Sequence, residues 1–143
     1  MSAQALAHPA VQSFIARNGI SHQDLRNDAR LSLTLDKKYR VQLHSTPHHR
    51  VALNSDLVSL TGIYHDRATG EAMARLMALA AGMLQQHPTT LCIDERRQAL
   101  MLQQTLPAAA DGAAVESAIA EFVNVLPFWL NACAAESSLM VSR

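Results

Sequence analysis

The amino-acid sequence predicts an α+β domain in which helices form a layer on an antiparallel sheet. Apolar residues recur every three or four positions in three separate stretches, which is the spacing of amphipathic helices. Along five other short segments apolar and polar residues alternate, which is the spacing of half-buried strands. These segments come as a group of three and a group of two, joined by short polar turns. Such grouping favours antiparallel pairing within each group over parallel crossovers.

The first expected element is a helix over residues 2–18. Pro9 lies inside this stretch and favours a start near residue 8, because proline is tolerated only in the first turn of a helix. The pair Asn18-Gly19 is typical of a helix end. Residues 20–28 are then expected to form a polar connection.

A meander of three strands should follow. Leu31, Leu33 and Leu35 alternate with polar residues and predict the first strand. The turn 36–38 leads to a second strand, where Tyr39, Val41 and Leu43 alternate with polar residues in the same way; a break at 46–49 then precedes a third strand from Val51.

The second half predicts a helix, a hairpin and a last helix. Thr69 is expected to cap a helix over 70–86, followed by strands at 89–94 and 98–105. Asp111 should cap a final helix that runs to about residue 134, and Pro127 should kink or split it. The order is therefore α-β-β-β-α-β-β-α. We expect one domain over 1–136 and a flexible tail over 137–143.

Composition excludes several classes of protein. The chain has 143 residues and 15.6 kDa, the size of a single domain, and 49% apolar against 17% charged residues excludes an intrinsically disordered chain. Twelve basic residues balance twelve acidic ones, and only six residues are aromatic (1 Trp, 2 Tyr, 3 Phe), which argues against a nucleic-acid partner. The basic residues are unevenly spread: residues 1–70 carry eight Lys or Arg and five Asp or Glu, a net +3.

The sequence predicts no membrane partner and a cytoplasmic location. The longest nearly apolar stretch, 72–84, has 13 residues, whereas a membrane helix needs about 20. The amino terminus has neither the basic start nor the apolar run of a signal peptide. Both cysteines, Cys92 and Cys133, are therefore expected to be reduced.

No catalytic, metal-binding or cofactor-binding motif stands out. His44, His48 and His49 cluster near one turn and His65 could join them, but they lack the spacing and the carboxylate or cysteine partners of a metal site. Solvated loop histidines are the favoured interpretation. No nucleophile elbow, phosphate loop or dinucleotide fingerprint is present, so we expect no enzymatic activity and no cofactor.

The middle helix predicts self-association. Between residues 72 and 84 only Arg75 is charged, and a helix that is apolar nearly all round is covered on more than one side. The sheet of so small a chain covers one side, so a second copy is the simplest cover for the other. The alternative is that loops or the last helix cover it. The expected dimer interface comprises Met73, Leu76, Met77, Ala80, Met83 and Leu84.

This order of elements resembles the class I type III secretion chaperones, the Tir-chaperone family. The resemblance runs from about Ala5 to Ala134. It is carried by the alternating segments Leu31–Asp36 and Tyr39–Leu43, the third strand through Leu53 and Leu60, the Leu- and Met-rich helix Met73–Leu84, the turn Asp94–Arg97 and the closing segment Phe122–Trp129.

The resemblance implies a cytoplasmic homodimer of a Gram-negative bacterium that catalyses nothing. Such a protein binds the amino-terminal region of a secreted effector, keeps it extended and competent for secretion, and presents it to the export apparatus, with the secretion ATPase as a further candidate partner. Family members are commonly acidic. This chain is neutral with a weakly basic first half, to which an effector with acidic flanks would fit.

An extended peptide can be held by backbone pairing at a sheet edge together with pockets for alternate side chains. The residues expected to contact the partner lie on the first helix and the meander, and the alternative for each is a place in the core: Phe14, Leu33, Val41, Leu43 and Leu53.

Two other hypotheses remain. One is a dimeric regulator or adaptor of the same fold with no tie to secretion, and a neighbouring effector gene or secretion operon would distinguish the two. The other is a small metal enzyme that uses the histidine cluster, which metal analysis of the purified protein would reveal.

Overall fold

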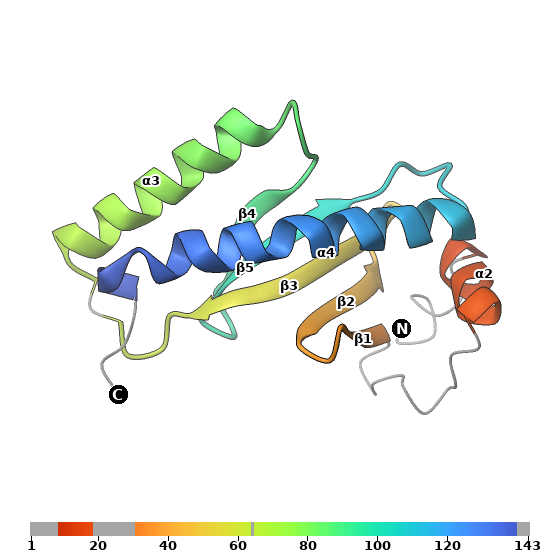
Figure 1. Cartoon of the computed structure of the whole chain (residues 1–143), viewed down its shortest axis with the longest axis horizontal. Coiled ribbons are helices and arrows are strands. Elements are labelled where there is room, and N and C mark those ends of the chain that lie inside the picture. The colour runs from red at the N-terminus through yellow and green to blue at the C-terminus, as the bar shows by residue number, and fades with distance from the viewer. Residues whose placement is uncertain (1–8, 19–30, 64, 140–143) are drawn as a thin grey trace. The chain divides into compact units, whose positions relative to one another are not determined.

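The computed structural model describes residues 9–18, 31–63 and 65–139, and Figure 1 shows its elements in chain order. The elements are helix α2 (Pro9–Asn18), strands β1 (Leu31–Leu35), β2 (Tyr39–Ser45) and β3 (Val51–Ser59), helix α3 (Arg67–Met83), strands β4 (Thr90–Asp94) and β5 (Ala99–Thr105), helix α4 (Gly112–Ala134) and the 3-10 turn η2 (Ser137–Leu139). The predicted order α-β-β-β-α-β-β-α is confirmed. The parts of the predicted first helix before Pro9, and the connection 19–30, lie outside the described residues.

The five strands form one antiparallel sheet in the order β1-β2-β3-β5-β4. β1 pairs with β2, β2 with β3, and β4 with β5, each antiparallel, as the two groups of alternating segments predict. β3 and β5 are neighbours although α3 and β4 lie between them in sequence. The sheet is therefore a meander and a hairpin joined along one pair of strands.

The described chain packs as two compact units. The first unit holds α2, β1, β2, residues 51–55 of β3 and residues 112–124 of α4. The second holds the remainder of β3, α3, β4, residues 99–103 of β5, residues 125–134 of α4 and η2. Three elements, β3, β5 and α4, thus contribute to both units.

In the first unit the predicted alternation is clearest on β2. Val41 and Leu43 are fully buried, whereas Arg40 is exposed and Gln42 is half-buried. On β3, by contrast, all of residues 51–55 are buried, so this part of the strand is covered on both faces and does not alternate. Both polar members have partners on the neighbouring strand: the Asn54 amide nitrogen lies 3.1 Å from Nδ1 of His44, and Ser55 Oγ donates a 2.7 Å hydrogen bond to the Arg40 carbonyl.

The first unit also contains a close approach of two helices. An ideal Cβ placed on Gly112, at the start of α4, would overlap Oγ of Ser13 on α2 and lie 2.8 Å from the Cβ of that serine. Real Cβ atoms do not come so close to other atoms, so glycine is required for this packing. The sequence offered no signal for it, because the nearest partner lies about a hundred residues away.

In the second unit α3 begins earlier than predicted. The helix starts at Arg67 and its cap is Asp66, not Thr69: the Asp66 carboxylate accepts a hydrogen bond of 2.9 Å from the Thr69 backbone N–H. Aspartate and threonine are both good caps. A capping side chain accepts a hydrogen bond from the backbone N–H two or three positions later, and here it is Asp66 that accepts such a bond, from Thr69. The bond lowers the pKa of Asp66.

The β4–β5 hairpin is tied to β3 by charge. Oδ1 of Asp94 accepts hydrogen bonds from the backbone N–H groups of Arg96 and Arg97 in the turn. The Arg97 guanidinium in turn forms an ion pair with Asp56 on β3. The turn predicted at 94–97 is therefore confirmed, and its charged residues add an exposed ion pair to the backbone pairing of β5 with β3.

Helix α4 is continuous through Pro127. Its cap is Asp111 as predicted, whose side chain accepts a 2.8 Å hydrogen bond from Ala114 N–H. The predicted split at Pro127 does not occur, since the helix runs from Gly112 to Ala134. By length and apolar content α4 could cross a membrane, but the core helix of a globular protein meets the same criterion, and a regular stripe along it is buried: Val115, Ile119, Phe122, Leu126, Trp129 and Cys133.

Of the predicted flexible tail, 137–143, the structure describes residues 137–139, and the remainder lies outside the described residues. Residues 137–139 form the turn η2, in which Leu139 is fully buried. Before the turn, Glu136 makes two hydrogen bonds with Arg75 of α3, of 2.6 and 2.9 Å. Burial of one leucine and a bidentate ion pair fix this segment against α3.

Candidate functional site

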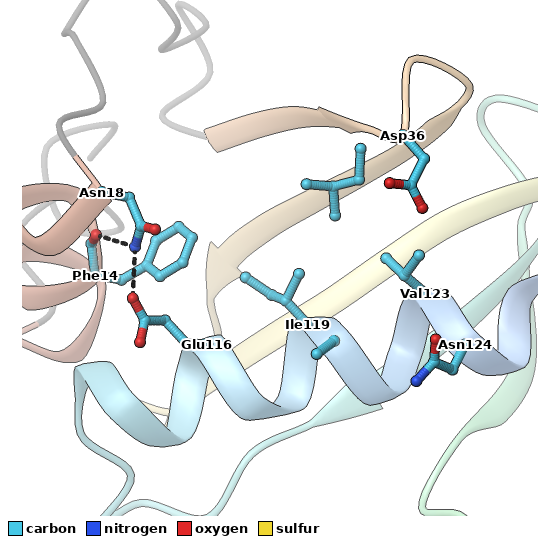
Figure 2. Close-up of a pocket in the computed structure, with 9 residues that line it drawn as sticks. Phe14, Asn18, Asp36, Glu116, Ile119, Val123 and Asn124 are labelled. Atoms are coloured by element: carbon cyan, nitrogen blue, oxygen red, sulfur yellow. Dashed lines mark hydrogen bonds between the residues drawn. The ribbon is translucent and has the colours of Figure 1, made fainter.

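The first unit contains a groove with a volume of about 440 Å³ (Figure 2). Three elements and one turn form its walls. The lining residues are Phe14 and Asn18 of α2, Leu35 of β1, Asp36 of the following turn, and Glu116, Ile119, Ala120, Val123 and Asn124 of α4.

The floor of the groove is apolar because of two periodicities. Positions 116, 119, 120, 123 and 124 recur every three or four residues and so share one face of α4. Leu35 is on the leucine face of β1, which continues the alternation of that strand. In Figure 2 the side chains of Ile119 and Val123 point into the space beneath the β1–β2 turn. Ile119 is buried and Val123 is half-buried, so Val123 offers apolar surface to a ligand.

One end of the groove is closed by a hydrogen-bonded cluster. Asn18 Nδ2 donates to the Phe14 carbonyl and to Glu116 Oε1, both at 2.9 Å, and Arg17 donates to Glu116 Oε2 at 3.0 Å. Hydrogen bonds from Arg17 and Asn18 lower the pKa of Glu116. Both oxygens of this carboxylate are therefore engaged within the protein.

The other end is formed by the turn after β1. Asp36 lies there across from Val123 and Asn124 (Figure 2). Asp36 and Lys37 both have a positive φ, 52° and 59°, and the turn is closed by a 3.1 Å hydrogen bond from Lys38 N–H to the Leu35 carbonyl. Within the described part of the chain Asp36 has no hydrogen bond or ion pair.

The structure places the residues predicted to contact a partner in different settings. Phe14 lines the groove and Leu33 is half-buried on β1. Val41, Leu43 and Leu53 are fully buried in the core of the first unit, with at most 1% of each exposed. The alternation of Val41 and Leu43 marks the buried face of β2.

The α4 side of the groove is not predicted from the sequence. Ile119 belongs to the buried stripe of α4, and Ala120 and Val123 lie just beside that stripe. A second apolar row adjacent to a buried one was the available signal. Which row faces an open groove depends on where the β1–β2 turn lies, and sequence spacing does not give that position.

A second exposed surface lies on α3, in the second unit. Of the six residues predicted at a dimer interface, Met77 and Leu84 are exposed, by 37% and 49%, and Met73 and Met83 are half-buried. Leu76 and Ala80 are buried inside the chain. Met73, Met77 and Leu84 recur at intervals of four and seven positions, so they share one outward face.

The described residues hold no group of three or more His, Cys, Asp or Glu side chains that could bind a metal ion. Cys92 Sγ donates to Gln103 Oε1 at 3.0 Å, and burial raises its pKa. Burial also raises the pKa of Cys133 to about 11. Both thiols are thus protonated near neutral pH, which makes them poor nucleophiles.

An open apolar groove and an exposed apolar helix face are features that proteins use to bind other polypeptides. The sequence profile of the Tir chaperone protein (CesT) family matches residues 10–130. The chain belongs to this family of type III secretion chaperones. The family predicted from the order of elements is thereby confirmed.

Solved structures show the same fold. A chain of the HopA1–SchA chaperone–effector complex aligns with a TM-score of 0.64 at 14% identity, covering 91% of this chain and 95% of that one. The ExsC–ExsE complex gives 0.60 at 19% identity, with 82% and 86% covered. The ExoU–SpcU complex from the type III secretion system of Pseudomonas aeruginosa gives 0.60 at 14%, with 85% and 96% covered. No curated protein sequence matches the chain closely enough to add a relative.

Proposed function

We propose that this chain binds the amino-terminal region of a secreted effector in the cytoplasm of a Gram-negative bacterium and keeps that region extended until export. Membership of the Tir chaperone family over residues 10–130 is the observation that carries the proposal. The HopA1–SchA structure supports it, because that structure is a chaperone–effector complex and contains a chain of the same fold.

The groove supplies a physical means of holding an extended chain. β1 ends the strand order of the sheet, and only β2 pairs with it among the described residues. An extended segment could add to this edge by backbone hydrogen bonds, while alternate side chains enter the adjoining groove. Leu35 and Val123 would then contact the apolar side chains of the segment. This mode holds a peptide without requiring it to fold.

We further propose that the working form is a homodimer joined through the outer face of α3. Met77 and Leu84 expose apolar side chains there, and contact with the same face of a second copy would remove them from water. The buried Leu76 and Ala80 hold α3 on its own chain and would support that interface from beneath. Delivery would involve the export apparatus, including contact with the secretion ATPase.

Membership of a chaperone family supports a role without catalysis, and the proposal includes neither a cofactor nor a metal. A regulator or adaptor of the same fold is the alternative function. The two differ in what they bind: a chaperone captures an exported protein, and an adaptor captures a protein that stays in the cytoplasm.

The test is affinity purification of the tagged chain from its own bacterium under secretion conditions, with mass spectrometry of what it binds. We expect one or a few proteins that also occur in the secreted fraction. Capture of cytoplasmic regulators alone would favour the adaptor. Stoichiometric metal in the purified protein would instead support the histidine-cluster enzyme.

A further inference from the structure

The groove has two acidic residues, Glu116 and Asp36, and they differ in whether their carboxylates are hydrogen-bonded within the protein. Glu116 accepts hydrogen bonds at both oxygens, from Arg17 and Asn18, so its charge is compensated. Asp36, at the opposite end, has no such partner in the described residues. Among the described residues no lysine or arginine lines the groove. Within that part of the chain, the Asp36 end of the groove therefore carries a carboxylate without a hydrogen-bonded or ion-paired partner.

Two lysines follow Asp36 and offset part of its charge, but they are placed outside the groove lining. Lys37 and Lys38 follow Asp36 in the same turn but neither lines the groove. The Lys38 ammonium lies 4.9 Å from the centre of the Tyr39 ring, in a cation–π contact. Lys37 occupies the second left-handed position of the turn, with an exposed side chain.

The turn fixes the backbone of Asp36 at the end of the groove. A positive φ at two successive residues without glycine is uncommon, and aspartate is among the residues that tolerate it best. β1 and β2 flank the turn in paired register, from Leu31 opposite Leu43 to Leu35 opposite Tyr39. The carboxylate is therefore presented beside Val123 and Asn124 by a short, paired hairpin (Figure 2).

We propose that the groove selects a peptide segment that places one large apolar side chain on the floor and a lysine or arginine at the Asp36 end. A volume of about 440 Å³ suits a side chain such as leucine or phenylalanine with its backbone. The apolar anchor contacts Leu35, Ile119 and Val123. The cation forms an ion pair with Asp36. Glu116, at the other end, is less suited to this role because both of its oxygens already accept hydrogen bonds.

This inference rests on the proposed function and adds a sequence preference to it. The anchor lies between two different ends, so the basic residue lies on one fixed side of it. The net +3 of residues 1–70 favours acidic flanks elsewhere on the effector, but the groove itself favours a basic one. Recognition then combines apolar contact on the groove floor with the negative charge of Asp36, which is opposite in sign to the net charge of residues 1–70.

The experiment is selection of short random peptides on the folded wild-type protein, followed by measurement of their affinity for matched variants. Ala120→Phe fills the groove from an exposed helix position, and Ser117→Phe places the same bulk on α4 outside the groove lining. Asp36→Asn removes the charge and keeps a residue that tolerates positive φ. Glu121→Gln removes a charge from α4 outside the lining.

We expect the peptides that bind wild type to lose at least about tenfold in affinity on Ala120→Phe and to keep it on Ser117→Phe, because burial of one apolar anchor is worth that much. Those peptides should be enriched in Lys or Arg on one side of the anchor, and Asp36→Asn should weaken them about twofold to fivefold, as an exposed ion pair would. Glu121→Gln should have no effect.

Peptides indifferent to Ala120→Phe would overturn the groove as the docking site. Groove-dependent peptides without a basic residue, or unaffected by Asp36→Asn, would overturn the charge preference. Neither result touches the proposed function, which depends on capture of an exported protein by the wild-type chain. Circular dichroism and thermal unfolding of each variant confirm that a loss of binding is not a loss of fold.

Discussion

Individual residues set the tolerance of this small chain to substitution. Gly112 brings α4 against α2 with no space for a Cβ, whereas Gly82, inside α3, has no atom within 4 Å of that position. Cys133 is almost completely buried and Cys92 is half-buried. Residues of the same type therefore differ widely in their effect on stability and reactivity.

Gly112→Ala should destabilise the protein by about 1–3 kcal/mol, because the new methyl group overlaps Ser13 and forces α2 to shift. Gly82→Ala is the matched control. It should stabilise by about 0.5–1 kcal/mol, since alanine restricts the unfolded chain and favours helix. Urea unfolding of both variants measures the difference. Equal stability of the two would contradict the close packing of α2 on α4.

The two thiols should react at very different rates. At pH 8 an aromatic disulfide reagent needs the thiolate form, and the pKa of Cys133 is raised to about 11 by burial. We expect Cys133 to react only on unfolding and Cys92 to react slowly in the folded protein. Mass spectrometry after timed labelling assigns each site. Rapid labelling of Cys133 in the native protein would show that α4 is not packed as described.

At the level of helices and strands, much of the fold follows from the sequence. The alternation in 39–43 predicts β2 because one face of this strand is buried and the other is not. The same reasoning fails at 51–55, where the strand lies between β2 and β5 and both faces are covered. The helix cap was misplaced from Asp66 to Thr69 because both types cap helices. Phe14 is among the residues that the sequence predicts to contact a partner, and Phe14 lines the groove. The groove residues of α4 are not predicted, because their place in the lining depends on how α4 packs against the β1–β2 hairpin.

The pair between Arg75 of α3 and Glu136 should make stability depend on pH. The hydrogen bonds from Arg75 lower the folded pKa of Glu136 below its ordinary value of 4.5. A lowered carboxyl pKa gives stability that is complete above the unfolded value and is lost as the pH falls through the folded value. The stability advantage of wild type over Glu136→Gln should therefore be present at pH 7 and shrink below about pH 4.5.

Thermal unfolding of both proteins across this pH range measures the effect. Glu71→Gln breaks a more exposed ion pair on the same helix, with Arg67, and should change stability little. A difference between wild type and Glu136→Gln that stays constant from pH 7 to pH 3 would show that the carboxylate charge contributes nothing.

At the scale of the whole protein, two exposed surfaces have different proposed partners. The groove is proposed to bind the effector, and the outer face of α3 is proposed to bind a second copy of the chain. Met77 and Leu79 allow a sharp test of the second assignment. They are almost equally exposed, 37% and 38%, but two residues apart they point to different sides of α3.

Met77→Asp should convert the dimer to a monomer at micromolar concentration, because an unpaired charge in an apolar contact is costly. Leu79→Asp makes the same change outside the proposed interface and should leave the dimer intact. Light scattering coupled to size exclusion measures both masses. A stable wild-type monomer, or loss of the dimer on both changes, would refute this interface.

The decisive measurement is hydrogen–deuterium exchange on the complex purified from the native bacterium. If the chain is an effector chaperone, the bound protein is an exported one, protection is confined to short stretches of its amino-terminal region, and the groove residues of α4 gain protection on binding. The remainder of that region should exchange as an unfolded chain does. A bound partner that is protected throughout a compact domain, with no change at the groove, would contradict the account.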